Sequence, residues 1–298
     1  MFVDRPKHCP VCLEQKFSTV VDCGDDFDPN MIKEIWVSSP HEFYFPFFKC
    51  INCETYYTQR YVDELEIPKL YSLLKDNLFG VDEDTYFQIQ DTYAAIIKKY
   101  FCNGQTQTKI DYFELGPDHG VLRKIIGDKV AEVRTSILVE PNKTCWPALK
   151  QFNPDSLVKD FGSLQVPDKS IDLAVAVHVL DHMLFPNEFL GSLAEKMRKG
   201  ACIFIVVHNG QSFLRRLMGR SWPPFCIHHP QIFNGLSLSR LLEANGFDNV
   251  LVKRTVNKFP LGFLISNVFN LLGLKCSWSW GPKISLPLGN IAVLGRKI

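Results

Sequence analysis

The feature that most constrains the fold is a repeating pattern in residues 109–183, where apolar runs end in turns or acids. The first run, KIDYFEL, reaches Glu114 before the turn GPDHG, and the next run, TSILV, leads to Glu140. A run followed by a glycine turn indicates a strand that enters a helix. Glycine lets the backbone approach a ligand closely because it has no Cβ, and an acid ending the next strand can accept hydrogen bonds from two ribose hydroxyls. The pattern therefore predicts a nucleoside site at the carboxyl edge of a parallel sheet.

Much of the remaining chain continues this alternation of strands and helices. We expect strands at residues 110–115, 136–140, 157–159, 171–178 and 201–208. We expect helices at residues 121–127, 143–151, 186–198 and 236–245. Two later apolar runs, residues 249–255 and 290–296, predict two further strands. Such alternation implies βαβ units with right-handed crossovers, so the predicted fold class is α/β with a doubly wound, Rossmann-like sheet.

These segments, in this order, resemble class I S-adenosylmethionine-dependent methyltransferases over roughly residues 85–298. Residues 114–120, ELGPDHG, match the family's acid and glycine turn, and residues 178–182, HVLDH, match the stretch after the fourth strand. The resemblance implies an antiparallel final strand. It also implies that Glu140 binds the ribose of the cofactor and that Asp160 and Phe161 border its adenine. The residues expected to contact S-adenosyl-L-methionine are Glu114, Gly116, Asp118, Gly120, Glu140, Pro141, Asp160, Phe161 and His178.

Asp118 stands where the family has the middle glycine of this turn. Asp tolerates a left-handed backbone better than most residues, so the turn can keep its shape. Its carboxylate would then face the carboxylate of the cofactor's methionine moiety, which is unfavourable. This opposition of charges motivates one alternative function, a non-catalytic binding protein on a degenerate methyltransferase fold.

Two C-x-x-C pairs occur near the amino terminus, Cys9 with Cys12 and Cys50 with Cys53. Two intervening residues let both thiolates of a pair reach one ion, and two pairs make the closed tetrahedral site of a structural zinc ion. Disulfides are the rival interpretation. However, a chain with ten cysteines and no secretory signal pattern is expected in a reducing, cytoplasmic compartment. Additional candidate ligands are Cys23 and, less favoured, His8 and His41.

The composition of the segments predicts three parts. Residues 1–60 are expected to form a zinc-binding domain, because a unit of this size often needs a metal to be stable. Residues 61–84 are expected to be a helical connector, since leucines over residues 62–78 share one face of a helix. Residues 85–298 would then form the methyltransferase domain.

Several of the eight histidines follow predicted strands, near the expected ligand edge of the sheet. A neutral imidazole can accept a proton near pH 7, and methyl transfer to a hydroxyl or an enolisable carbon needs that step. The predicted proton acceptors are, in order of preference, His229, His228 and His182. The doublet follows two prolines that can present it over the cleft. On an extended backbone only one of two adjacent side chains should face the acceptor.

The segment 222–233, WPPFCIHHPQIF, resembles a histidine-containing segment of methyltransferases that act on sugars and other small metabolites. Paired cysteine knuckles before a methyltransferase domain also resemble deoxysugar C-methyltransferases. In that family, histidines at positions matching His182 and His228 or His229 flank the sugar. The resemblance implies a small-molecule acceptor: a sugar, a nucleotide sugar or a polyketide-like metabolite, methylated on carbon or oxygen.

The net charge is +1, which gives no overall attraction to nucleic acid. The alternative enzyme is an RNA methyltransferase that grips RNA with its zinc unit, and it would need a basic patch there. Residues 260–274 are apolar but too short to span a bilayer. They predict an amphipathic helix packed on the core or across the subunit interface of a homo-oligomer.

Overall fold

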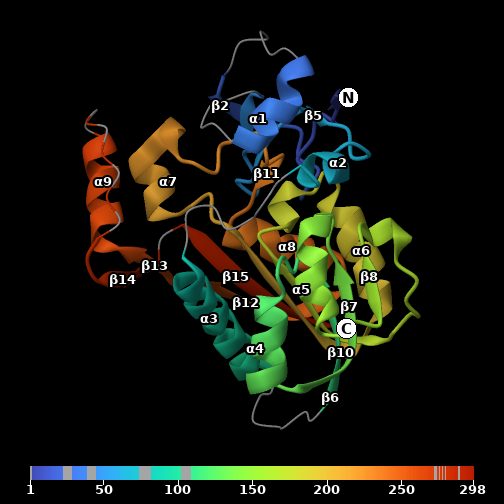
Figure 1. Cartoon of the computed structure of the whole chain (residues 1–298). Coiled ribbons are helices and arrows are strands. Elements are labelled where there is room, and N and C mark those ends of the chain that lie inside the picture. Colours follow the sequence, from blue (N-terminus) through green and yellow to red (C-terminus); the bar gives the residue numbers. More distant parts are fainter. Residues whose placement is uncertain are drawn as a thin grey trace.

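The computed structural model describes residues 2–22, 29–38, 45–73, 82–101, 109–271, 274, 276, 278, 280–287 and 289–298. Figure 1 shows a twisted central sheet flanked by helices, with a smaller N-terminal unit above it. The additional ligand candidates Cys23 and His41, and the predicted connector from residue 74 to residue 81, lie outside the described residues.

The central sheet contains seven strands in the order β12-β15-β10-β9-β6-β7-β8. Strand β15 (Asn290–Lys297) lies between β10 and β12 (Phe247–Arg254) and runs antiparallel to both. The other neighbours pair in parallel: β6 (Lys109–Leu115), β7 (Glu132–Val139), β8 (Ser156–Val158), β9 (Ile171–Val177) and β10 (Met197–His208). The predicted α/β class and the antiparallel final strand are therefore confirmed.

Side chains of the central strands alternate between two apolar clusters, one on each face of the sheet. In β6, Phe113 packs in the cluster that includes residues of α6 (Pro186–Lys196) and α8 (Gly235–Ala244). Its neighbour Tyr112 packs in the cluster that includes residues of α3 (Glu83–Phe101), α4 (Val121–Lys129) and α5 (Trp146–Lys150). Successive strand residues face opposite sides, so a strand covered by helices on both sides has a continuous apolar sequence.

The N-terminal unit is joined to the rest of the chain through a shared sheet of order β11-β4-β3-β2. Three of its strands come from the N-terminal unit: β2 (Phe17–Val21), β3 (Phe47–Cys50) and β4 (Tyr56–Tyr57). The fourth, β11 (Gln231–Ile232), follows the histidine pair and runs antiparallel to β4. A second sheet pairs β1 (Phe2–Asp4) with β5 (Arg60–Val62), and the described helices of the unit are α1 (Ile32–Ser38) and α2 (Ile67–Tyr71).

Arg5 strengthens this junction. Its buried guanidinium donates to the carbonyl oxygens of Thr58 at 3.2 Å, Pro230 at 2.9 Å and Leu184 at 2.9 Å. It also donates to Oε1 of Gln231 at 2.8 Å. Burial lowers the pKa of Arg5 to about 10, so the group stays charged at neutral pH. One cation therefore fixes the N-terminal unit against two loops of the larger unit.

Two predicted helices have different boundaries in the structure. The helix expected over residues 62–78 is wrong at its start, because Val62 pairs with Phe2 in a sheet and α2 begins only at Ile67. The proline in the first turn of α2 suits a helix start, where its missing N–H leaves no bond unmade. The helix expected over residues 186–198 ends at Lys196, because Met197 begins β10 and pairs with Ile171.

After β12 the chain leaves the central sheet. Strands β13 (Asn257–Pro260) and β14 (Lys283–Leu286) pair with each other, and α9 (Leu261–Leu271) follows β13. Figure 1 shows α9 projecting away from the central sheet. The apolar segment 260–274 is thus helical, as predicted, over the part that α9 covers. Within the described ranges, no helix is both long and apolar enough to cross a membrane.

Candidate active site

A cavity of about 1300 Å³ lies at the carboxyl ends of the parallel strands. The ends of β6, β7, β9 and β10 contribute Glu114, Glu140, His178 and His208 to its lining. The N-terminal unit contributes further lining residues, among them Tyr71 in α2. The volume exceeds the roughly 300–1,000 Å³ of a pocket for one drug-sized ligand, so a nucleoside cofactor and a small acceptor fit side by side.

The glycine turn after β6 is built from residues with left-handed backbone. Gly116 has φ +68°, Asp118 φ +52° and Gly120 φ +78°. A Cβ on Gly116 would lie 2.6 Å from Cγ2 of Val179. Glycine is therefore required at this position both because a Cβ has no room and because the backbone φ is positive. Asp118 adopts the left-handed conformation expected of it. Gly120 precedes the first turn of α4 and, unlike the other two, is not part of the cavity wall.

The carboxylate of Asp118 is held by side chains within the protein. The thiol of Cys145 donates to its Oδ1 at 3.2 Å, and the hydroxyl of Tyr86 lies 3.5 Å from its Oδ2. Asp118 is largely buried. Burial of Tyr86, followed by the effect of the neighbouring Asp118, raises the pKa of the Tyr86 hydroxyl. The carboxylate of Asp118, which stands where the family has a glycine, is therefore held by hydrogen bonds from Cys145 and Tyr86.

The two strand-end acids are buried and accept hydrogen bonds. The backbone N–H groups of Asp118 and Asn142 donate to Glu140, at 3.0 Å on Oε2 and 2.8 Å on Oε1. The hydroxyl of Tyr112 donates to Oε2 of Glu114 at 2.8 Å. Burial raises the pKa of Glu114 and of Glu140 to about 7 in each case. Both acids thus change charge close to neutral pH.

The residues predicted to border adenine lie on the same cavity wall. Pro141, Asp160 and Phe161 all line it. Asp160 caps a short 3-10 turn by accepting from the N–H of Ser163 at 2.8 Å. The ring of Phe161 packs edge-on against Phe113 at a centroid distance of 5.9 Å. These contacts place an apolar ring and an acid on the wall that Glu140 also lines.

All three predicted proton acceptors, His182, His228 and His229, line this cavity, together with His178 and His208. The rings of His182 and His229 lie 4.5 Å apart between centroids, and those of His208 and His229 lie 4.9 Å apart. Burial lowers the pKa of His178 to about 3, and it also lowers the pKa of the three predicted acceptors. The imidazoles of His178 and of the three predicted acceptors are therefore neutral at pH 7, and each carries a lone pair.

Hydrogen bonds to carbonyl groups define how the histidine pair is oriented. Nδ1 of His229 donates to the carbonyl of Pro224 at 2.8 Å, and Nε2 of His228 donates to the carbonyl of Trp36 at 2.9 Å. In the described part of the chain, Nε2 of His229 has no hydrogen-bond partner. The prolines form the expected turn, since the N–H of Phe225 donates to the carbonyl of Trp222 at 3.0 Å. The expectation that only one of the pair faces the cavity is wrong, because both histidines line it and both bond a backbone carbonyl.

Sequence reasoning did not identify several cavity residues. The hydroxyl of Tyr71 is hydrogen-bonded to Nδ1 of His182, although the two residues belong to different units. No local pattern marks Tyr71, because only the docking of the units brings it to the site. Asp181, in the 3-10 turn η4 (Leu180–His182), is buried beneath the histidines. It stands within the stretch HVLDH that resembles the family's segment after the fourth strand, so its position there could have drawn attention to it.

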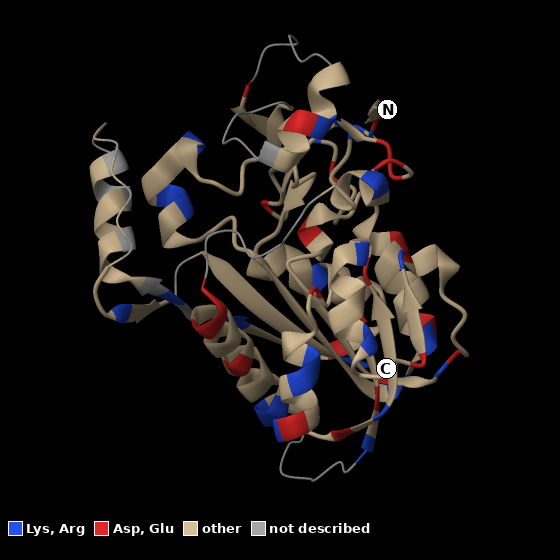
Figure 2. Ribbon diagram, viewed as in Figure 1, with Lys and Arg blue, Asp and Glu red and all other residues tan. Residues whose placement is uncertain are grey.

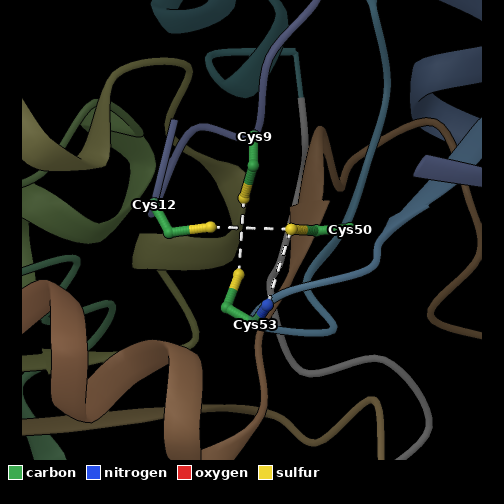
Figure 3. A group of neighbouring side chains, drawn as sticks. All are labelled: Cys9, Cys12, Cys50 and Cys53. Carbon is green, nitrogen blue, oxygen red and sulfur yellow. Dashed lines mark hydrogen bonds between the residues drawn. The ribbon is translucent and has the colours of Figure 1, made fainter. Parts of the chain in front are cut away.

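A separate cluster of sulfur atoms lies in the N-terminal unit. The Sγ atoms of Cys9 and Cys53 are 3.4 Å apart, and those of Cys12 and Cys50 are 3.5 Å apart. Figure 3 shows the four side chains pointing toward a common centre. All four sulfur atoms lie within 4.8 Å of one another. Sulfurs around a tetrahedral zinc ion at 2.3 Å would be about 3.8 Å apart, so this set fits a metal ion. His8 does not belong to the cluster.

Comparisons with solved structures give likenesses of low identity. A possible histamine N-methyltransferase from Thermotoga maritima is 17% identical, with a TM-score of 0.46, over 72% of this chain and 94% of its own. An S-adenosylmethionine-dependent methyltransferase from Archaeoglobus fulgidus is 17% identical, with a TM-score of 0.47, over 72% and 100%. A phosphoethanolamine N-methyltransferase from Haemonchus contortus is 10% identical, with a TM-score of 0.43, over 72% and 57%.

The sequence gives no match among curated proteins. It does match the model of a protein family described as a methyltransferase domain, over residues 87–252, which is more than half of the chain. The matched region contains the glycine turn, both strand-end acids and the histidine-lined wall of the cavity. The chain therefore belongs to the methyltransferase-domain family and is a methyltransferase enzyme dependent on S-adenosylmethionine.

Proposed function

We propose that this methyltransferase acts on a small-molecule acceptor, a sugar, nucleotide sugar or polyketide-like metabolite, and that a cavity histidine assists the transfer. One observation carries this proposal: a single cavity is lined by both the strand-end acid Glu140 and His229, whose Nε2 has no partner among the described residues. The bound cofactor supplies an electrophilic methyl group. The protein must hold the acceptor in line with that methyl and remove a proton from it.

The cofactor would occupy the wall formed by the ends of β6 and β7. Each oxygen of Glu140 already accepts one backbone N–H. A carboxylate oxygen has two lone pairs, so each retains one for a ribose hydroxyl. Gly116 lets the backbone approach the cofactor because it carries no Cβ. Contacts to the cofactor are also proposed for Glu114, Asp118, Pro141, Asp160, Phe161 and His178, whereas Gly120, which lies outside the cavity wall, would act by shaping the turn.

Among the histidines, His229 remains the first choice as proton acceptor, followed by His228 and His182. The bond from its Nδ1–H to Pro224 fixes the tautomer, which leaves the lone pair on Nε2. The bond to Trp36 fixes the tautomer of His228 in the same way, and His182 shares a hydrogen bond with Tyr71. His229 is placed first because its Nε2 is buried without a partner in the described chain.

The distribution of charge favours a small acceptor over RNA. Figure 2 shows basic residues interspersed with acidic ones, as in α4, which carries both signs. RNA-binding surfaces gather lysine and arginine on one face. The cavity wall is instead lined largely by aromatic, apolar and neutral histidine side chains, with several acids. Such a wall suits a hydroxylated organic molecule.

The sulfur cluster is proposed to bind one structural zinc ion through Cys9, Cys12, Cys50 and Cys53. Four thiolates complete a tetrahedron and leave no position for substrate, so the ion would support the fold. We also propose the division into a zinc-binding domain (residues 1–60), a connector (61–84) and a methyltransferase domain (85–298). In this arrangement the zinc domain supports the acceptor side of the cavity.

The test is a binding and transfer experiment with the full chain. Calorimetric titration with S-adenosylmethionine should give binding well below millimolar concentration. Incubation with labelled cofactor and a panel of nucleotide sugars, free sugars and hydroxylated ketones should transfer label to at least one class. Salt-sensitive labelling of RNA, with none of the small acceptors labelled, would instead support the RNA alternative. Absence of cofactor binding would support the degenerate binding protein.

A further inference from the structure

A buried carboxylate beneath the cavity histidines lacks a hydrogen-bond partner on one oxygen. Asp181 is fully buried, and its Oδ2 accepts from the N–H of His208 at 3.2 Å. Its Oδ1 has no partner within the described residues. A buried polar atom that stays unpaired is costly, so native proteins satisfy almost all of them through protein, water or a bound ion. Oδ1 of Asp181 therefore points to a missing partner.

Two imidazoles lie close to this carboxylate. Nε2 of His182 lies 3.8 Å from Oδ1 of Asp181. One ligand atom from each of Asp181, His182 and His229 lies within 4.8 Å of the other two. Nε2 of His229 is also buried without a partner in the described chain. The carboxylate and the two imidazoles thus converge, and Asp181 and His229 each have a buried atom with no hydrogen bond to the described residues.

The outer nitrogen of each imidazole is already bonded, as in histidines that ligate metals. Nδ1 of His229 donates to the carbonyl of Pro224, and Nδ1 of His182 contacts the hydroxyl of Tyr71. A metal-binding histidine almost always uses its other nitrogen in this way, because that bond fixes the ring and its tautomer. The same arrangement leaves both Nε2 atoms available to a common ligand.

We infer that Asp181, His182 and His229 bind a divalent transition-metal ion, Zn²⁺ or one of similar preference, at the base of the cavity. Two histidines and one carboxylate are a ligand set used for such ions, with open positions left for substrate. Ligands about 2.1 Å from a tetrahedral ion are about 3.4 Å apart. Side-chain shifts of about an ångström would close the present spacing.

A neighbouring group is less suited to hold the ion. His178, Asp181 and His208 also lie within 4.8 Å of one another. That group shares Asp181 with the first, and Nδ1 of its His178 is likewise buried without a partner in the described chain. The first group is assigned because Nε2 of its His182 approaches the unpaired Oδ1 of Asp181 to 3.8 Å.

The ion would define the chemical class of the acceptor. This step rests on the proposed methyl transfer, whereas metal binding itself does not. His182 and His229 line the cavity, so the open position of the ion would face it. A hydroxyl or enol oxygen placed there would lose its proton more readily, as metal-bound water does. Because Nε2 of His229 would then be a ligand, the proton would pass to His228 or to solvent instead of to His229. The inferred acceptor is therefore a molecule with a hydroxyl next to a carbonyl or second hydroxyl, which can bind through oxygen.

The test uses the full-length protein with zinc in its cysteine cluster and adds Co²⁺. We expect a second equivalent of metal whose visible absorption lacks thiolate charge-transfer bands. Asp181→Asn and His229→Gln should each weaken this second site by more than about tenfold, as loss of metal-site residues does. His228→Gln is the matched control, since His228 shares the cavity but not the ligand set, and it should retain the site. Two ligand variants are used so that misfolding of one does not decide the result. Each variant must still bind S-adenosylmethionine, which shows that it is folded.

Uptake of a single metal equivalent by the wild type, or unchanged Co²⁺ binding in both ligand variants, would overturn the inference. Cobalt binding needs neither cofactor nor acceptor, so this failure is distinct from a failure of methyl transfer. A protein can be prepared that keeps zinc in its cysteine cluster but lacks the cavity metal. If this protein still transfers methyl groups, the cavity metal has no role in the reaction, whereas the proposed function stands.

Discussion

The backbone N–H of Asp118 donates a hydrogen bond to Oε2 of Glu140 across 3.0 Å. This bond joins the glycine turn after β6 to the acid that follows β7. The turn keeps its left-handed form at Asp118, φ +52°, while the acid is oriented toward the cavity. Replacing the middle glycine of the family pattern therefore leaves intact a link between the two parts of the cofactor wall.

Replacing Glu140 by alanine should weaken binding of S-adenosylmethionine. Hydrogen bonds to a charged acceptor contribute about 1.5–3 kcal/mol, so we expect at least about a tenfold rise in Kd by calorimetric titration. Glu132→Ala is the control, because Glu132 begins the same strand at its far end and forms only an exposed ion pair with Lys109. Equal affinity of the Glu140 variant and the wild type would mean that the ribose lies elsewhere.

Cofactor affinity should rise with pH through neutrality. Burial raises the pKa of Glu140 to about 7, so the ionised, stronger acceptor forms only above that pH. Between pH 6 and 8 the ionised fraction grows about tenfold, and Kd should fall by up to about that factor. The stability of the unliganded protein should run the other way. The unfolded chain loses this proton near pH 4.5, so stability falls as pH rises from there to about 7.

Glu140→Gln separates this titration from that of Glu114, whose pKa burial also raises to about 7. The variant keeps the shape of the side chain but cannot ionise. Its cofactor affinity should be low and should lose most of the dependence on pH. A full pH response in Glu140→Gln would assign the effect to Glu114 instead.

Gly116→Ala should impair both folding stability and cofactor binding. The residue has φ +68°, and a new Cβ would lie 2.6 Å from Val179. The left-handed backbone alone costs roughly 1–2 kcal/mol, and relief of the clash would move the turn. Gly200→Ala is the matched control, since Gly200 has φ +80° with no heavy atom within 4 Å of the added Cβ. Denaturation curves should show the larger loss at Gly116, and only that variant should bind cofactor poorly.

Loss of the proposed zinc ion should also affect residues 229–234, which follow the start of the histidine pair. The carbonyl of Cys53 accepts from the side chain of Asn234 at 2.8 Å, and Asn234 caps α8. Metal binding is coupled to folding of its ligands. Cys53→Ser should therefore reduce zinc content and increase amide exchange in both residues 47–57 and 229–234. Metal analysis and hydrogen exchange measure the two effects. Full zinc occupancy after this substitution, or zinc-free wild-type protein, would contradict the assignment.

The sequence was most informative where a local pattern has one structural solution. The apolar runs of β6 and β9 predicted buried parallel strands, because such runs suit strands covered on both faces. The two C-x-x-C pairs predicted the sulfur cluster, because two intervening residues let both thiolates of a pair reach one ion. Strand β11 was not predicted, since its two residues, Gln231 and Ile232, have no periodicity and pair with β4 only after the units dock. The same docking brings Tyr71 to His182. Contacts between distant segments leave no signal in either segment alone.

The last prediction concerns the proton acceptor. His229→Ala should lower turnover by about a hundredfold or more, the usual contribution of general acid–base catalysis, because the cavity loses Nε2 of His229, which has no partner among the described residues. Cofactor affinity should change little, since the cofactor wall lies on β6 and β7. His228→Ala and His182→Ala rank the other two candidates, and His8→Ala is the control, because His8 lies outside the cavity wall and the sulfur cluster. Steady-state rates on an acceptor found with the labelled panel give the comparison. Turnover within a few-fold of wild type in all three cavity variants would mean that no protein base is needed, and the acceptor would then be a group already nucleophilic, such as an amine.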